Sequence, residues 1–252
     1  MRRLRPADFG HRWHHHASLK AAAHRLVLGC LCDGHPTNGI SALQLQRELS
    51  LGSYKTAWLL CTKLRRAMAA PGRNLLSGLV EVDKTEITCR SKRDRAAGSG
   101  SSELGKLVVV GAVEVEDLRL GRIRLSAMPD ESAASVHTLR VSNLAPDATV
   151  QTSEEAVYSG GPAANDDPRA IGANDAHKAT ARVHRIFSDL KVWALSVYHG
   201  LRRRHLQSYL DEFVYRFNRR RNRHAAFPAL LGFVAGHPPT TYDTLGSSGA
   251  KA

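Results

Sequence analysis

The sequence predicts an α/β protein with a mixed sheet flanked by helices, preceded by a small helical region. Three observations lead to this fold class. Apolar and polar residues alternate at 79–83 and at 121–125, on either side of the apolar run 107–115, as in an antiparallel meander. Apolar residues then recur every three or four positions in 183–197 and in 206–217, as in amphipathic helices that pack on a core.

The positive charge of the chain is concentrated in two segments. The 252 residues carry a formal net charge of +13. Residues 1–70 and 171–224 each carry +8, whereas residues 71–170 carry −3. Two basic segments around a mildly acidic centre indicate a protein that binds the phosphate backbone of nucleic acid. No apolar run approaches the roughly 20 residues of a membrane span, and four irregularly spaced cysteines favour a reducing cytoplasm.

Residues 21–70 are predicted to form the small helical region, after a basic arm over 1–20 that lacks periodicity and is expected to be disordered. Ser41 is expected to cap a short helix, with Gln44 completing a capping box. A turn at 50–53 precedes a second helix that carries the basic side chains Lys55, Lys63, Arg65 and Arg66. Two helices joined by a tight turn are typical of a helix-turn-helix, although an ordinary helical hairpin fits the pattern equally well.

Residues 76–233 are predicted to form the main domain. After the three strands, 132–145 has a helical pattern and 148–152 predicts a fourth strand. The second amphipathic helix runs into an arginine-rich stretch at 217–224, whose arginines we expect to face solvent or a polyanion. Three strands, a helix, a strand and two closing helices fit a ribonuclease-H-like sheet. The tail over 237–252 is expected to be disordered.

Four stretches of the chain closely resemble bacterial insertion-sequence transposases of the ISXO type: 38–68, 76–87, 183–200 and 205–220. The resemblance runs from about residue 21 to 233. It implies a DDE-type recombinase with a ribonuclease-H-like catalytic domain, which cuts and joins DNA with Mg²⁺ or, as an alternative, Mn²⁺. It also implies that the partner is double-stranded DNA at the element ends. We further expect a homo-oligomer on that DNA, a cytoplasmic, nucleoid-associated location and no membrane contact.

The resemblance assigns the first metal-binding aspartate to Asp83, at the end of the stretch VEVD. Carboxylate oxygens at the ends of adjacent strands hold hard divalent cations, which activate the attacking hydroxyl and stabilise the leaving oxygen. Lys84 follows directly, where the family usually has an acid, and we expect its charge to compete with the metal.

The second family aspartate falls on Ser153 in the stretch TSEEAVY, where Tyr158 keeps the register. A serine supplies no negative charge. Glu154 is a substitute metal ligand only if the backbone shifts, because its side chain points to the opposite face of an extended strand. We therefore expect an impaired transposase. The alternative is a non-catalytic DNA-binding protein or regulator derived from a transposase, and a basic scaffold that binds RNA or acidic partners is a third hypothesis.

The third catalytic position of the family falls on His184, in the first of the two closing helices. A histidine nitrogen is a poor ligand for Mg²⁺. Asp189 on the same helix is a rival for this position. Glu212 is a second rival, but is expected to be an exposed helix residue near Arg216.

Further DNA contacts are expected from two arginine runs in the C-terminal half: Arg202, Arg203, Arg204, Arg219, Arg220 and Arg221. Relatives often begin with a zinc ribbon held by four cysteines. Cys30 is the first cysteine of this chain, and its separation from Cys32 does not match a ribbon, so we expect no zinc site.

Overall fold

The structure is a computed structural model, and it describes these parts of the chain: residues 39–69, 74–90, 105–116, 119–128, 133–152, 180–198, 201–222, 228–230 and 232–233. The arm expected over 1–20 and the tail expected over 237–252 lie outside the described residues. So does the start of the small helical region, up to residue 38.

Two short helices open the described chain, α2 (Ala42–Glu48) and α3 (Tyr54–Met68). The hydroxyl of Ser41 accepts a hydrogen bond of 3.1 Å from the backbone N–H of Gln44, which confirms the expected cap. The Gln44 side chain donates to Glu48, 3.0 Å away, so it is engaged on its own helix and not in the reciprocal half of a capping box.

A mixed sheet follows, with the strand order β3-β2-β1-β4. Strand β1 (Leu79–Arg90) pairs antiparallel with β2 (Gly105–Glu116), which pairs antiparallel with β3 (Arg119–Met128). Strand β4 (Thr149–Thr152) runs parallel to the beginning of β1. The predicted meander and fourth strand are therefore present.

Strand β1 is longer than the predicted 79–83, because Ile87 and Cys89 continue the burial on one of its faces. Its last residues pair in parallel with a short strand, β5 (Leu201–Arg202). Two residues are too few to show a periodicity, so no sequence pattern predicts β5.

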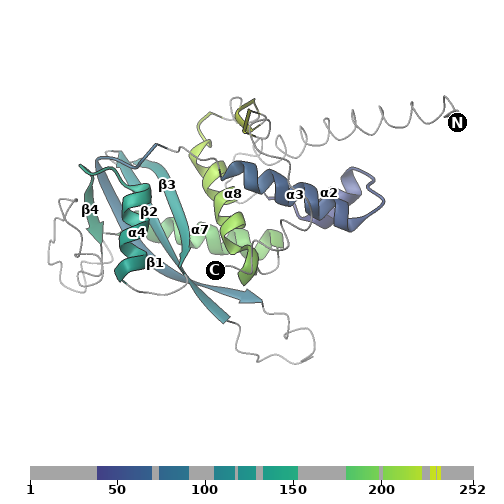
Figure 1. Ribbon diagram of the computed structural model, residues 1–252, viewed down its shortest axis with the longest axis horizontal. Coiled ribbons are helices and arrows are strands. Elements are labelled where there is room, and N and C mark those ends of the chain that lie inside the picture. The colour runs from purple at the N-terminus through teal and green to yellow at the C-terminus, as the bar shows by residue number, and fades with distance from the viewer. Residues whose placement is uncertain are drawn as a thin grey trace, which may run out of the picture.

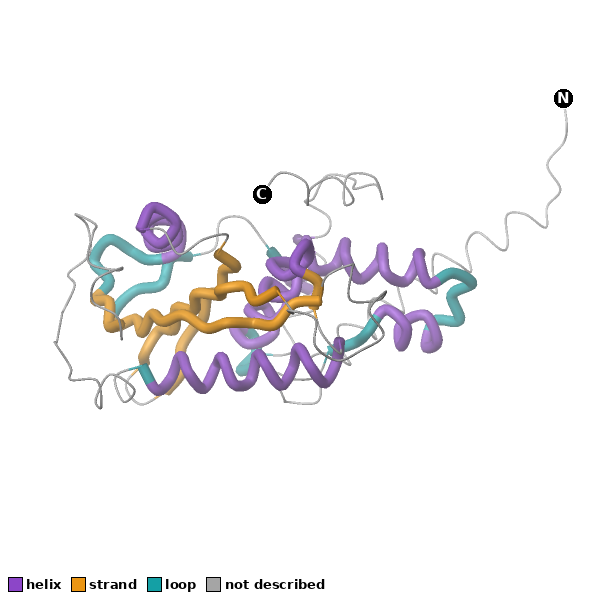
Figure 2. The backbone as a smooth tube through the Cα atoms, turned by 90° about the horizontal axis from the view of Figure 1, so that it is seen from below, coloured by secondary structure: helices purple, strands orange, loops and turns teal. Residues whose placement is uncertain are grey.

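Helices cover both faces of the sheet (Figures 1 and 2). Helix α4 (Ala133–Asn143) lies on one face, and α7 (Ala181–Tyr198) and α8 (Leu206–Asn218) lie on the other. A 3-10 turn, η2 (Arg203–His205), joins β5 to α8. The alternation of β1 separates two cores, since Val80 and Val82 pack in the cluster that includes α4, whereas Ile87 and Cys89 pack beneath α7 and α8.

Helix α3 packs against α8, and α2 packs against α3 (Figure 1). Leu45 of α2 and Leu64 of α3 belong to one buried cluster with Tyr215 of α8 and Leu230. The apolar face of the small helical region is therefore buried by the C-terminal part of the chain.

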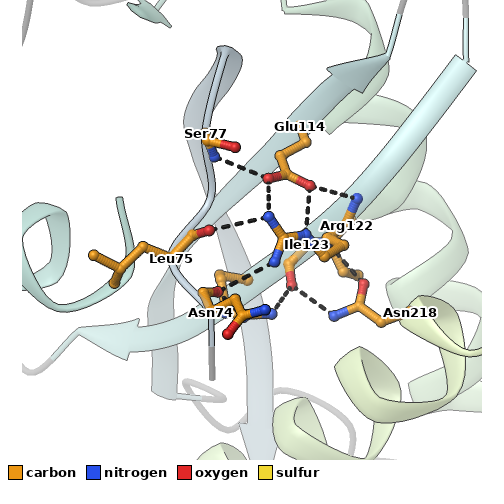
Figure 3. A network of polar contacts seen from close by, with 8 residues as sticks. Asn74, Leu75, Ser77, Glu114, Arg122, Ile123 and Asn218 are labelled. Atoms are coloured by element: carbon orange, nitrogen blue, oxygen red, sulfur yellow. Dashed lines mark hydrogen bonds and ion pairs between the residues drawn. The ribbon is translucent and has the colours of Figure 1, made fainter. Parts of the chain in front are cut away.

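A buried polar network ties the segment before β1 to β2 and β3 (Figure 3). Glu114 accepts hydrogen bonds from the Ser77 N–H at 2.9 Å and from the Arg122 Nε at 2.7 Å. Burial alone raises the pKa of Glu114, but the hydrogen bonds from Arg122 and Ser77 outweigh it and hold the pKa below its ordinary value. Asn218 exchanges two hydrogen bonds with the Ile123 backbone, which fixes the end of α8 to β3.

Helix α7 lies close against the sheet because β2 has a glycine beneath it. A Cβ at Gly111 would lie 2.6 Å from Cε1 of Phe187 and 3.2 Å from Cδ2 of Leu125. Only a residue without a side chain lets the Phe187 ring approach the strand this closely. Gly111 thus sets the distance between α7 and the sheet.

We expect Gly111→Ala to lower the free energy of unfolding by about 1–3 kcal/mol, because Phe187 must move to admit the added methyl group. Gly105→Ala is the matched control at the start of the same strand, where an added Cβ meets nothing within 4 Å, and its effect should stay below about 0.5 kcal/mol. Urea unfolding of both variants measures the difference. Equal losses of stability would contradict this account of the helix position.

Candidate functional site

Asp83 lies near the middle of β1 and is buried. It pairs across the ladder with Gly111, and its side chain shares a face of β1 with Ile87, beneath α7. Its Oδ1 accepts a hydrogen bond of 2.7 Å from the backbone N–H of Lys84. The alternation of the strand puts the Lys84 side chain on the face opposite that of Asp83, and the expected competition of its charge with a metal stays a prediction.

His184 lies in the first turns of α7, and its Nε2 is 3.3 Å from Oδ2 of Asp83. The fold thus brings together two of the predicted catalytic residues, which are far apart in the sequence. Asp83 is buried, whereas 37% of the His184 side chain is exposed, so solvent reaches the pair from the histidine side. The His184 ring also meets the edge of Phe187, with 6.2 Å between the ring centroids.

Asp189 is half-buried on the same helix. It lies five residues after His184, which is about 7.5 Å further along the helix axis. The geometry of α7 therefore favours His184 over Asp189 as the residue that faces Asp83.

Sequence reasoning missed Glu81, a fully buried carboxylate two residues before Asp83. Its Oε2 accepts hydrogen bonds from the backbone N–H groups of Arg182 at 2.9 Å and Val183 at 3.1 Å, and its Oε1 pairs with the Arg182 guanidinium at 2.8 Å. The alternation of β1 carried a signal for it, because Glu81 shares a face with Asp83 and Ile87. A charged residue on a strand face that a helix covers needs hydrogen-bond donors or a counter-charge, because burial of an unpaired charge is costly.

Glu212 is buried, not exposed as expected from its helical spacing. The predicted pairing with Arg216 is present, and Arg65 of α3 also pairs with Glu212, with 2.7 Å between Nε and Oε2. The Tyr198 hydroxyl donates to the same carboxylate at 3.0 Å. Burial alone raises the pKa of Glu212, but the charges of Arg216 and Arg65 outweigh it and the pKa is lower than its ordinary value.

The expectation that Arg65 contacts DNA is therefore wrong, because its side chain is buried and paired with Glu212. It is 5% exposed, and its guanidinium lies 4.3 Å from the centroid of the Tyr209 ring as well as against Glu212. A surface arginine at this position was a reasonable expectation from charge alone. The sequence did not reveal that α8 covers this side of α3.

The other expected DNA-binding residues divide into two groups. Exposed side chains occupy two adjacent elements, α3 and the β5–η2 segment: Lys55, Lys63, Arg66, Arg202, Arg203 and Arg204. These elements meet where the rings of Trp58 and His205 contact edge-on, with 5.5 Å between centroids. The pKa of His205 is lowered by burial and by the nearby Arg204 and Arg202.

The arginines after α8 are less available than expected. Arg220 is half-buried, lies 3.8 Å from the centroid of the Phe217 ring and donates to backbone carbonyls that include Leu120 and Gly121. Arg219 lies 4.0 Å over the Tyr215 ring, and Arg221 pairs with Glu116 at 3.0 Å. The expectation that these arginines must face solvent or a polyanion is therefore wrong for Arg220.

Ser153 and Glu154 lie outside the described residues. The parallel pairing of β1 with β4 is described up to Val82 and Thr152, one residue before Asp83 and Ser153. Within the described parts of the chain, no three His, Cys, Asp or Glu side chains gather closely enough to hold a metal ion. Asp83 contributes a carboxylate suited to a hard divalent cation, and His184 contributes a nitrogen, which Mn²⁺ accepts more readily than Mg²⁺.

Comparison with known proteins identifies the class to which this fold and site belong. A family profile matches residues 75–218, more than half of the chain, and describes a transposase domain. The chain belongs to the family of ISXO2-like transposase domains. Searches of curated proteins and of solved structures found no match. Among the described helices, none is both long and apolar enough to cross a membrane.

We expect Glu212→Gln to lower the free energy of unfolding by about 3 kcal/mol or more, because it leaves the buried charges of Arg65 and Arg216 without a counter-charge. Glu48→Gln on α2 is the control. Its exposed carboxylate accepts a hydrogen bond from the Gln44 side chain, so its effect should stay below about 0.5 kcal/mol.

The same variant should change the pH dependence of stability. Because the folded-state pKa of Glu212 is lowered, its stabilisation is fully present above the unfolded pKa of about 4.3 and is lost as the pH falls through the folded value. Urea unfolding of wild type and Glu212→Gln should therefore converge as the pH decreases. A constant difference between them down to strongly acid pH would contradict the assignment.

Proposed function

We propose that this protein is an insertion-sequence transposase that binds element-end DNA as a homo-oligomer and catalyses metal-dependent cleavage and strand transfer. The observation that carries the proposal is the approach of His184 on α7 to Asp83 on β1 at 3.3 Å. Membership of a transposase-domain family supports the same reaction class.

The sheet topology is consistent with a ribonuclease-H-like catalytic domain. Three antiparallel strands are followed by a helix and by a parallel strand beside β1. In a parallel pair, the carboxyl ends of the two strands lie at the same edge of the sheet. β4 runs toward Asp83 in this way, which is where a second metal ligand is needed.

A divalent metal bound at Asp83 would supply activation of the attacking hydroxyl and stabilisation of the leaving oxygen. Asp83 suits the role of a carboxylate ligand because it is held by the Lys84 N–H and has Oδ2 directed toward His184. His184 is half-exposed, so it is accessible to a DNA phosphate as well as to the metal. With one nitrogen donor, we expect Mn²⁺ to support the reaction better than Mg²⁺.

A second candidate function follows from the serine at 153, where the family has its second aspartate. If no other carboxylate takes this place, the site lacks one of its negative charges and holds the metal weakly. The protein would then bind element ends without cutting them and would act as a regulator derived from a transposase.

We expect cleavage and strand transfer on element-end DNA with Mn²⁺ to be weak in the wild type, abolished in Asp83→Ala and increased in Ser153→Asp. A new carboxylate supplies the missing charge, whereas loss of Asp83 removes the ligand on the central strand. Gel assays of cleaved and joined products, with DNA binding measured in parallel, distinguish the variants.

Strong wild-type activity that disappears in Asp83→Ala would show that another carboxylate fills the second position and that the impairment hypothesis is wrong. DNA binding without cleavage in the wild type and in Ser153→Asp would favour the regulator. Absence of DNA binding in all variants would exclude both functions.

The exposed basic residues of α3 and of the β5–η2 segment form the surface that we propose for DNA. The contact between Trp58 and His205 joins the two elements, so their charges lie on neighbouring parts of the molecule. Contacts of this kind with phosphates are independent of sequence and weaken as counterions compete at higher salt.

We expect Arg203→Gln to weaken DNA binding to a similar extent on all duplexes and to reduce the slope of log affinity against log salt by about 0.9, because one phosphate contact is lost. Arg119→Gln is the charge-matched control, since Arg119 is exposed at the start of β3 and does not belong to the proposed surface. Fluorescence anisotropy over a salt series measures both slopes. The same change of slope in both variants would contradict the proposed surface, because it would show that only the net charge of the protein matters.

A further inference from the structure

Strand β1 presents a second buried carboxylate to α7, and the proposed chemistry does not use it. Glu81 is 0% exposed and lies two residues before Asp83 on the same face of the strand. Its partners are the N–H groups of Arg182 and Val183 and the guanidinium of Arg182. These are the second and third residues of α7, directly before His184.

The hydrogen bonds of Glu81 satisfy groups that the helix itself leaves without acceptors. The first N–H groups of an α-helix have no intrahelical partner and usually bond to a capping side chain just before the helix. Here a carboxylate from a distant strand takes that place, and its negative charge also suits the positive end of the helix dipole. The start of α7 is therefore attached to β1 at a defined residue.

This attachment lies next to the proposed site on both elements. On α7, the bonded Val183 is adjacent to His184, and on β1, Glu81 is one side-chain repeat from Asp83. One residue of helix corresponds to a rotation of about 100°, so a slip of α7 by a single residue would turn His184 away from Asp83.

A second contact restrains α7 one turn further along. Phe187 packs over Gly111, and Gly111 is the ladder partner of Asp83. His184 thus lies between two fixed points, the Glu81 bonds before it and the Phe187 contact after it. The Phe187 contact limits how closely the helix approaches the sheet, whereas the Glu81 bonds fix its register along the strand.

We propose that Glu81 is a positioning residue: its carboxylate fixes the register of α7 on β1 and thereby holds His184 against Asp83. Only the catalytic importance of this placement rests on the proposed function. The placement of His184 itself is measurable in the full-length protein without DNA, metal or activity.

The test uses the NMR signals of the His184 ring in ¹⁵N-histidine-labelled protein at one fixed pH, assigned with His184→Gln. In the wild type, Asp83→Asn should shift these signals, because the two side chains are in contact. In a Glu81→Met background, which keeps the side-chain volume but removes both acceptors, the response to Asp83→Asn should fall nearly to zero. The amides of Arg182 and Val183 should exchange with solvent about tenfold faster or more.

Conservative variants separate position from charge. Glu81→Gln retains an oxygen that accepts both backbone N–H groups, while the partly exposed Arg182 side chain turns to solvent, so the His184 response should stay close to that of the wild type. Glu81→Asp keeps the charge but withdraws the carboxylate by one methylene, and should give a partial loss.

Glu114→Gln is the matched control for lost stability. Glu114 is also buried on a central strand and also binds a backbone N–H and an arginine, but its partners are Ser77 and Arg122 (Figure 3). It should lower the unfolding midpoint without changing the His184 signals or their response to Asp83→Asn.

The proposal would be overturned if the His184 signals in Glu81→Met responded to Asp83→Asn as they do in the wild type. If Glu81→Met does not fold, the same result in Glu81→Asp would overturn it. So would an equal loss of the response in Glu114→Gln, because it would indicate a general loosening of the fold. If the wild type cleaves DNA, Glu81→Met should reduce cleavage with DNA affinity unchanged, and Glu81→Gln should restore it. If neither the wild type nor Ser153→Asp cleaves DNA, the catalytic part of the proposed function fails, and the NMR result still decides the role of Glu81.

Discussion

The packing of α7 on the face of β1 and β2 is the constraint on which the candidate site depends. Val183, Ile186, Phe187 and Leu190 form one side of the helix and are buried together with the apolar residues of the sheet. This apolar contact fixes which side of α7 faces the strands, and therefore that His184 lies near the sheet and not in open solvent. Two polar features lie within this apolar layer, Glu81 and Asp83, and both are satisfied by residues at the start of the same helix. The candidate site thus consists of polar residues at the end of the apolar interface between α7 and the sheet.

The elements that sequence patterns predicted best are those with a clear period. The alternation in β1 and β3, the apolar run of β2 and the stripes of α7 and α8 each correspond to an element in the structure. Asp83 and His184 were found through a resemblance that depends on long motifs, and the fold brings them into contact. The existence of β5 was not predictable, because two residues show no period, and the end of β1 depends on its tertiary pairing with β2 and β5.

Charged residues were the main source of error, for one physical reason. The sequence predicts where a charge is, but its burial depends on what a distant segment brings to it. Arg65 and Glu212 each look like surface residues on amphipathic helices, and each is buried because the other is there. Glu81 is buried because α7 begins at its position, and Arg220 is half-buried because backbone carbonyls of β3 accept its hydrogen bonds. A helical or strand period shows which face a charged residue lies on, as for Glu81, but not which distant residue pairs with it.

The ion cluster at Glu212 has a consequence for the distance along DNA between the proposed binding surface and the proposed cleavage site. Arg65 ties α3 to α8, and Asn218 ties the end of α8 to β3, so a chain of short polar contacts runs from the basic helix into the sheet that carries Asp83. If α3 binds a duplex as proposed, these contacts hold the duplex at a constant offset from Asp83 along the duplex axis. The number of base pairs between the bound sequence and the cut phosphate would then be a property of the folded chain, and the side chains that set it would be ones that never touch the DNA.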